Sequence, residues 1–156
     1  MNHQRLQSYA AIAEVIGAFA IVVSLLYAGH EVRRASTMSS LDAHVMLYER
    51  ERQHNAVLFE NRDMAELVVL ADEAPDELTG ADRLRYIEYQ HDFLDSWEMA
   101  FEYHRDGILD DEDWDAWDAW YVQQMRSRPR FAWEENRHNF PDGNFTSHVD
   151  AALHRD

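Results

Sequence analysis

YAAIAEVIGAFAIVVSLLYA, residues 9–28, is the stretch that decides the fold of this chain, because Glu14 is its only charged residue. At a helical rise of about 1.5 Å per residue, a segment of this length covers roughly the 30 Å hydrocarbon core of a bilayer. Apolar runs of this length are typical of membrane-spanning helices. We therefore expect residues 1–35 to form an N-terminal tail and one transmembrane helix.

Two other interpretations of residues 9–28 stay open at the level of sequence: a buried helix of a soluble protein and a cleaved signal peptide. A signal peptide has a basic start, a shorter apolar core and small residues at its cleavage site. Here the apolar run continues through Leu25, Leu26 and Tyr27 before Gly29. The pattern favours an uncleaved anchor.

Basic residues on the two sides of the span predict its orientation. Arg5 precedes the span, whereas Arg33 and Arg34 follow it directly and Arg50 and Arg52 come next. Lys and Arg are enriched on the cytoplasmic side of membrane helices. We expect a single-pass protein of the bacterial inner membrane, with its C-terminal domain in the cytoplasm and Arg33 and Arg34 at the membrane exit.

Small residues recur along the span at spacings of three or four, which collects them on one helix face: Ala10, Ala13, Gly17, Ala20, Ser24 and Ala28. Small side chains let two helix backbones approach closely in lipid. This face predicts association with other membrane subunits or with a second copy of the chain. Glu14 lies beside the face, and three roles stay open for it: reaching the headgroup layer, contacting a partner, or lining a pore of identical chains.

Composition excludes several classes of function. The formal net charge is −16, with no Lys in the chain, and a surface of this sign repels nucleic-acid phosphates and anionic lipids. There is no Cys, so thiolate and disulfide chemistry are absent. No Gly-rich phosphate loop and no recognisable nucleophile motif occurs, which gives no support to a nucleotide-binding or hydrolase function. We expect no cofactor, no nucleic-acid partner and no enzyme activity.

We expect residues 36–156 to form one acidic helical domain. Only five Gly and three Pro occur in the chain, which favours packed helices over a disordered tail. No Pro precedes Pro75, so the helix of the span can run straight on into the domain. Apolar residues continue after the span at helix-like intervals: Met38, Leu41, Val45, Tyr48 and Phe59.

Capping residues and helix breakers divide the rest of the domain. We expect helices over residues 62–71, 79–107, 110–126, 129–137 and 145–154, the first capped by Asn61 and the third opened by Asp110. The helix over 79–107 should be the centre of the core, because it carries a broad apolar face: Tyr86, Ile87, Phe93, Leu94, Trp97, Ala100 and Phe101. In the next helix Trp114, Trp117 and Tyr121 repeat on one side, as core residues would.

A resemblance covers nearly the whole chain. It is carried by Ser24-Leu25-Leu26-Tyr27 with Arg33 close behind, by Tyr103-His104-Arg105-Asp106-Gly107-Ile108-Leu109-Asp110 with Trp114, and by Trp133 with the closing segment 140–153. With these features the chain resembles a large group of short bacterial proteins that have one predicted span, a helical domain and no assigned activity. The resemblance implies architecture and membrane location and carries over no catalytic residue. The chain departs from the group at His30 and Glu31, where Gln is frequent.

Two patterns suggest metal sites, and each has a simpler explanation. Glu88 with His91, and Glu135 with His138, match the Glu-x-x-His spacing of di-iron helical bundles, but Glu88 lies opposite the apolar face of its helix. Residues 102–113 have the length of a calcium loop around Gly107 but lack its ligand types, and a helix end followed by a cap explains the same residues.

The sequence thus predicts an all-α protein, with one N-terminal transmembrane helix and a small helical-bundle domain, that acts by association. It would be an accessory subunit of a larger membrane complex or a homo-oligomer. The alternatives are an oligomeric ion-conducting protein with Glu14 near the pore and, after it, a metal-binding helical-bundle enzyme.

Overall fold

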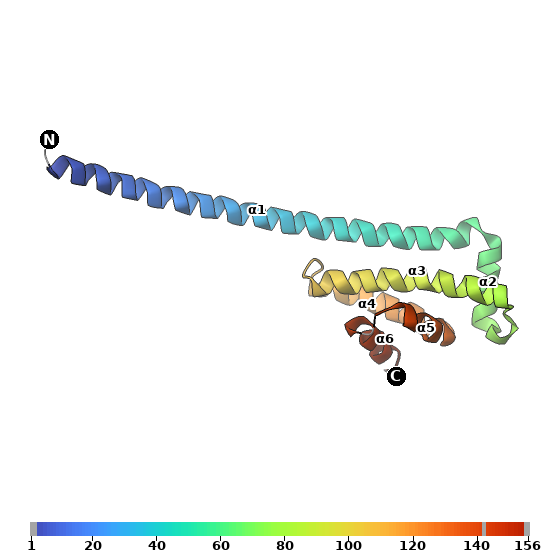
Figure 1. Ribbon diagram of the computed structural model, residues 1–156. Helices are drawn as coiled ribbons and strands as arrows, with labels where there is room; N and C mark the ends of the chain where they lie inside the picture. Colours follow the sequence, from blue (N-terminus) through green and yellow to red (C-terminus); the bar gives the residue numbers. More distant parts are fainter. Residues whose placement is uncertain (1–2, 142, 155–156) are drawn as a thin grey trace. The chain divides into compact units, whose positions relative to one another are not determined.

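The computed structural model describes residues 3–141 and 143–154, with the side chains of Glu14 and of all described residues from Ile16 onward. This described part is all-α, as predicted, and contains no strand (Figure 1). The elements run in the order α1 (His3–Glu60), α2 (Arg62–Glu73), η1 (Pro75–Glu77), α3 (Gly80–Arg105), α4 (Asp111–Arg126), α5 (Phe131–Asn136), η2 (Arg137–Asn139) and α6 (Asn144–His154), where η marks a short 3₁₀ helix.

The chain divides into two compact units, Met1–Leu41 and Asp42–Asp156. The first unit consists of the N-terminal part of α1, and the second holds the rest of α1 and all later elements. α1 continues without a break from His3 to Glu60, as expected from the absence of Pro.

The first unit is a helix that exposes its apolar side chains. From Ile16 to Ser39 every side chain is exposed, and Leu26 and Tyr27 each keep 69% of their surface accessible. Two hydroxyls of this unit find partners within the helix itself: Ser24 donates to the Ala20 carbonyl at 2.8 Å, and Thr37 donates to the Arg33 carbonyl at 3.1 Å. A hydroxyl satisfied in this way leaves no unpaired donor on the helix surface.

In the second unit three helices begin directly after a capping side chain, at the predicted caps Asn61 and Asp110 and at Thr79. Asn61, Thr79 and Asp110 each accept a hydrogen bond from the backbone N–H three residues further along, at 3.3, 3.2 and 2.9 Å. These side chains satisfy donors that the first turn of a helix leaves without partners. Gly107, two residues after the end of α3, has φ 71, a left-handed conformation that glycine adopts without a steric penalty.

α3 forms the centre of the core, which confirms the prediction. All residues of its predicted apolar face are buried except Phe101. Phe101 is partly buried and packs against the core cluster that contains Phe93, Leu94 and Trp97. Trp97 is fully buried, stacks on Tyr121 of α4 with ring centroids 5.8 Å apart, and meets Phe145 of α6 edge to face at 5.7 Å. α4, α5 and α2 pack on α3, and α6 packs on α4 (Figure 1).

The part of α1 within the second unit is also a core element, but its buried face is not the apolar one. Ala43, Leu47, Glu51 and His54 are buried, at spacings of three and four residues. The apolar residues that predicted this helix are all exposed: Met38, Leu41, Val45, Tyr48 and Phe59. The prediction of a helix was therefore correct, while its inward face combines one large apolar residue, Leu47, with the small Ala43 and the polar Glu51 and His54.

Carboxylates at the edge of the core accept hydrogen bonds from the indole N–H groups of two buried Trp residues and from one His. Asp118 accepts a hydrogen bond from the Trp97 indole at 2.9 Å and from His148 Nε2 at 2.6 Å. Asp150 accepts one from the Trp133 indole at 2.7 Å. Buried indole N–H groups usually find an acceptor, and here each finds an acidic one.

Asp92 of α3 ties α1 to the core. Arg50 Nη2 donates to it at 3.1 Å, and His54 Nδ1 lies 3.3 Å from its other oxygen. The hydrogen bond from His54, reinforced by the charges of His54 and Arg50, holds the pKa of Asp92 below its usual range although burial opposes this. The imidazole of His54 also stacks on Tyr89, with ring centroids 4.0 Å apart.

Candidate functional site

The residues predicted to act in the membrane lie on the N-terminal part of α1. Gly17, Ala20, Ser24 and Ala28 are helical and exposed, and so are Glu14, Arg33 and Arg34, whereas the side chains of Ala10 and Ala13 lie outside the described set. By length and composition, α1 is the one helix of the described part that could cross a membrane, and none of its apolar window is buried.

The Glu-x-x-His residues take other partners. Glu88 is exposed, as expected, and Glu135 accepts hydrogen bonds from the guanidinium of Arg83. Among the described residues, no group of three or more His, Asp and Glu side chains has an arrangement suited to a metal ion.

The residues of the calcium-like loop also form a helix end and a cap. Arg105 pairs with Glu102 at 3.3 Å, and His104 Nε2 lies 3.0 Å from Asp111 Oδ1. Asp110 caps α4. The loop carboxylates therefore point to basic groups and to the backbone instead of toward one centre.

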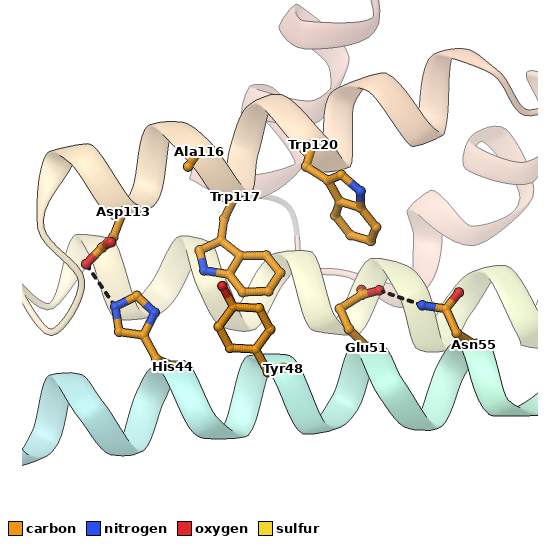
Figure 2. A pocket seen from close by; sticks show the side chains of 8 residues that line it. All are labelled: His44, Tyr48, Glu51, Asn55, Asp113, Ala116, Trp117 and Trp120. Carbon is orange, nitrogen blue, oxygen red and sulfur yellow. Dashed lines mark hydrogen bonds and ion pairs between the residues drawn. The ribbon is translucent and has the colours of Figure 1, made fainter.

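A cavity that the sequence analysis did not predict lies between α1 and α4 within the second unit. Its volume is about 390 Å³, within the usual range for small-ligand sites. Figure 2 shows side chains from both helices pointing into it: His44, Tyr48, Glu51 and Asn55 from α1, and Asp113, Ala116, Trp117 and Trp120 from α4.

Three aromatic rings form the walls of this cavity. Tyr48 and Trp117 pack against each other with ring centroids 5.0 Å apart, and the planes of Trp117 and Trp120 meet at 87°. Tyr48 is 64% exposed, whereas Trp117 and Trp120 are half-buried. Trp117, expected to be a core residue, is thus a wall of the cavity.

Carboxylates lie at both ends of the cavity. His44 Nε2 lies 2.8 Å from Asp113 Oδ2, so the imidazole N–H donates to Asp113 at one end. At the other end Glu51 is only 8% exposed. Its Oε2 accepts a long hydrogen bond of 3.5 Å from Asn55, and its Oε1 has no hydrogen-bond partner among the described residues.

Burial raises the pKa of Glu51 to about 7, and the nearby charge of Asp92 adds to the shift. The other groups of α3 and α4 near Glu51 include Tyr89 and Tyr121, whose pKa values are raised by burial and by the Glu51 charge; at Tyr89 the charge of Arg128 opposes the shift. Among the described residues, the Glu51 carboxylate has only the Asn55 amide as a hydrogen-bond partner, and no cation contacts it directly. A carboxylate of this kind is unusual outside functional sites.

Glu51→Gln is expected to raise the free energy of unfolding by about 3 kcal/mol at pH 8.5 and to leave it unchanged at pH 4, because one pKa unit corresponds to about 1.4 kcal/mol. The ordinary pKa of Glu is 4.5, and the folded value is about 7, so the folded chain holds this proton more tightly than the unfolded chain. Wild-type stability is therefore lost as the pH rises from about 4.5 through 7, and the neutral amide avoids that loss.

Urea unfolding of the full chain in a neutral detergent, followed by near-ultraviolet circular dichroism, measures this difference. Glu60→Gln, an exposed carboxylate on the same helix, serves as the control and should change little at either pH. A Glu51→Gln effect of equal size at both pH values would contradict the assignment.

The sequence did not predict the cavity because none of its lining residues belongs to a recognised binding or catalytic motif. His44, Tyr48, Glu51 and Asn55 follow one another at spacings of four, three and four residues, which places them on one face of α1. The signal in the sequence that could have indicated the cavity was this row of polar and aromatic residues on one face of the helix. The chain as a whole matches no protein-family model, no curated protein and no solved structure, so its function has to be inferred from this geometry and from α1.

Proposed function

We propose that the protein is a single-pass membrane protein that acts by association, as an accessory subunit of a larger membrane complex or as a homo-oligomer. The observation that supports this is the apolar window of α1, none of which is buried within the protein. Exposed apolar surface in water is unfavourable by about 25 cal/mol per Å². A bilayer, or a bilayer together with partner helices, would cover it.

The chemistry of the helix suits lipid. All backbone groups within an α-helix are paired along the segment, as the hydrocarbon core requires. Ser24 directs its hydroxyl to the Ala20 carbonyl, so this polar group needs no water. Gly17, Ala20, Ser24 and Ala28 would offer a face of small side chains to a partner helix.

We further propose that the span lies in a bacterial inner membrane with the acidic domain in the cytoplasm. Arg33 and Arg34, both exposed directly after the apolar stretch, favour that side. Because the chain contains no Cys, Ser147→Cys would carry its sole thiol, on an exposed position of α6. An impermeant maleimide should label it only after spheroplasts are broken.

Expression in bacteria tests the anchor. The wild-type chain is expected in the membrane fraction after a carbonate wash, and Val22→Arg/Leu26→Arg should release it, because each central Arg opposes insertion by about 2.5–3.5 kcal/mol. The matched control is Val45→Arg/Phe59→Arg, which adds the same charges at exposed positions of the second unit. A wild-type chain found in the soluble fraction would refute the proposal.

Gentle detergent extraction tests the association. The particle mass should equal a multiple of 18.4 kDa for a homo-oligomer, or include foreign subunits for an accessory role. Gly17→Leu, which fills the face of small side chains, should then dissociate the particle. A lone 18.4 kDa chain in every mild detergent would rule out both forms of association.

A further inference from the structure

We propose that the cavity between α1 and α4 binds a small organic ammonium ion, with Glu51 as its counter-ion and the rings of Tyr48, Trp117 and Trp120 as its walls (Figure 2). This inference goes beyond membrane association and does not depend on it, because all of these residues belong to the second unit.

Glu51 supplies the charge that such a ligand needs. It is more than nine-tenths buried, and its Oε1 has no donor among the described residues. The two Arg residues beside it in sequence point elsewhere: Arg50 donates to Ser96 and Asp92, and Arg52 donates to Glu49. A buried carboxylate is stabilised by a cation that can approach it closely, so an ammonium group would complete this site.

The aromatic walls select the kind of cation. Rings attract positive charge to their faces within about 6 Å of the ring centroid, and sites for ammonium ligands combine several such faces. Trp117 lies 5.0 Å from Tyr48 and meets Trp120 at nearly a right angle, so the two indoles form a corner. An alkyl or methyl group on nitrogen would pack in that corner while the charge faces Glu51.

A metal ion fits these residues poorly. Mg²⁺ and Ca²⁺ require several oxygen ligands at once. Here Asp113 already accepts from His44, and the described residues contain no group of three or more ligands arranged for a metal. The rings of Tyr48, Trp117 and Trp120 in the lining leave an organic cation as the matching ligand.

The electrostatics of the chain favour the same ligand class. The net charge of −16 attracts cations and repels anions, so phosphorylated or carboxylated ligands would be disfavoured at the cavity. The chain has no Lys, so no ammonium side chain of its own can occupy the site.

Isothermal titration of the full chain in a neutral maltoside detergent tests the proposal, at constant ionic strength. Choline chloride and n-butylammonium chloride are the probes, and sodium chloride is the reference. We expect saturable binding of an ammonium probe and none of sodium. Glu51→Gln should weaken that binding at least about tenfold, whereas Glu60→Gln should leave it unchanged. Tyr48→Leu, which removes a largely exposed wall, should weaken it about threefold.

A pH series gives a second readout. Protonation of Glu51, whose pKa is about 7, should weaken binding about tenfold between pH 8 and pH 6. Asp92 and Tyr89 of α3 and Tyr121 of α4 surround this carboxylate and stay in place in Glu51→Gln. Any pH dependence of probe binding that remains in Glu51→Gln therefore comes from groups other than Glu51.

Three results would overturn the proposal: no saturable heat with either ammonium probe up to 20 mM, equal affinity in wild type and Glu51→Gln, or an equal response to sodium. Near-ultraviolet circular dichroism of each variant confirms that the domain is folded. Because the titration uses detergent-solubilised chain, failure here leaves the membrane proposal intact, and failure of membrane insertion leaves this one intact.

Discussion

Trp97→Ala is expected to lower the free energy of unfolding of the second unit by about 3–5 kcal/mol, the usual range for a buried Trp replaced by Ala. Trp97 is fully buried, and its ring contacts Tyr121 and Phe145 from two other helices. The substitution opens a cavity at the junction of α3, α4 and α6. It also leaves Asp118 without its indole donor.

Chemical unfolding monitored by the near-ultraviolet signal of the remaining aromatic residues measures this loss. Leu84→Ala is the matched control on the same helix, because Leu84 is 60% exposed, and it should change stability by less than about 0.5 kcal/mol. Similar effects of the two substitutions would show that α3 does not organise the core around Trp97.

Leu47→Ala is expected to destabilise the same unit by about 2–5 kcal/mol. Leu47 has no accessible surface and belongs to the cluster that contains Trp97 and Tyr121. The result tests whether the C-terminal part of α1 is an integral core helix of the domain, because a helix that merely connects the two units would tolerate the change.

Val45→Ala provides the comparison for this second substitution. Val45 lies two residues away on the same helix and is 68% exposed, so its loss should have little effect. A stable Leu47→Ala variant would place the beginning of the domain at α2 instead of within α1.

Much of the helical architecture could be predicted because local chemistry specifies it. Asn61, Thr79 and Asp110 each satisfy backbone donors of the turn that follows, and such short-range signals can be read from a single sequence. The apolar face of α3 was predictable for a similar reason, since its residues are large and its periodicity is helical.

The inward face of α1 could not be predicted from hydrophobicity. Its buried positions include Ala43, Glu51 and His54, while the larger apolar residue Val45 is 68% exposed. His54 is buried because Tyr89 and Asp92, distant in sequence, provide a stacking ring and a carboxylate. Only the packing of α3 against α1 reveals such partners.

The cavity escaped sequence analysis for the same physical reason. Its walls come from two helices separated by fifty residues, and Trp117 has the spacing of a core residue. Whether an aromatic ring on an apolar face is covered or borders a cavity depends on the size of the side chain opposite. Here Glu51 of α1 lies opposite the indoles of α4, and a space stays open between the two helices.

The paired indoles and carboxylates have an evolutionary consequence. Trp97 with Asp118, and Trp133 with Asp150, are each joined by one short hydrogen bond, so losing the carboxylate alone would leave a buried indole N–H unsatisfied. In homologues each Asp should be kept wherever its Trp is kept. The large apolar side chains exposed on the N-terminal part of α1, among them Phe19, Ile21 and Leu25, have no such partner and need only remain apolar, so they should diverge faster while keeping the same character.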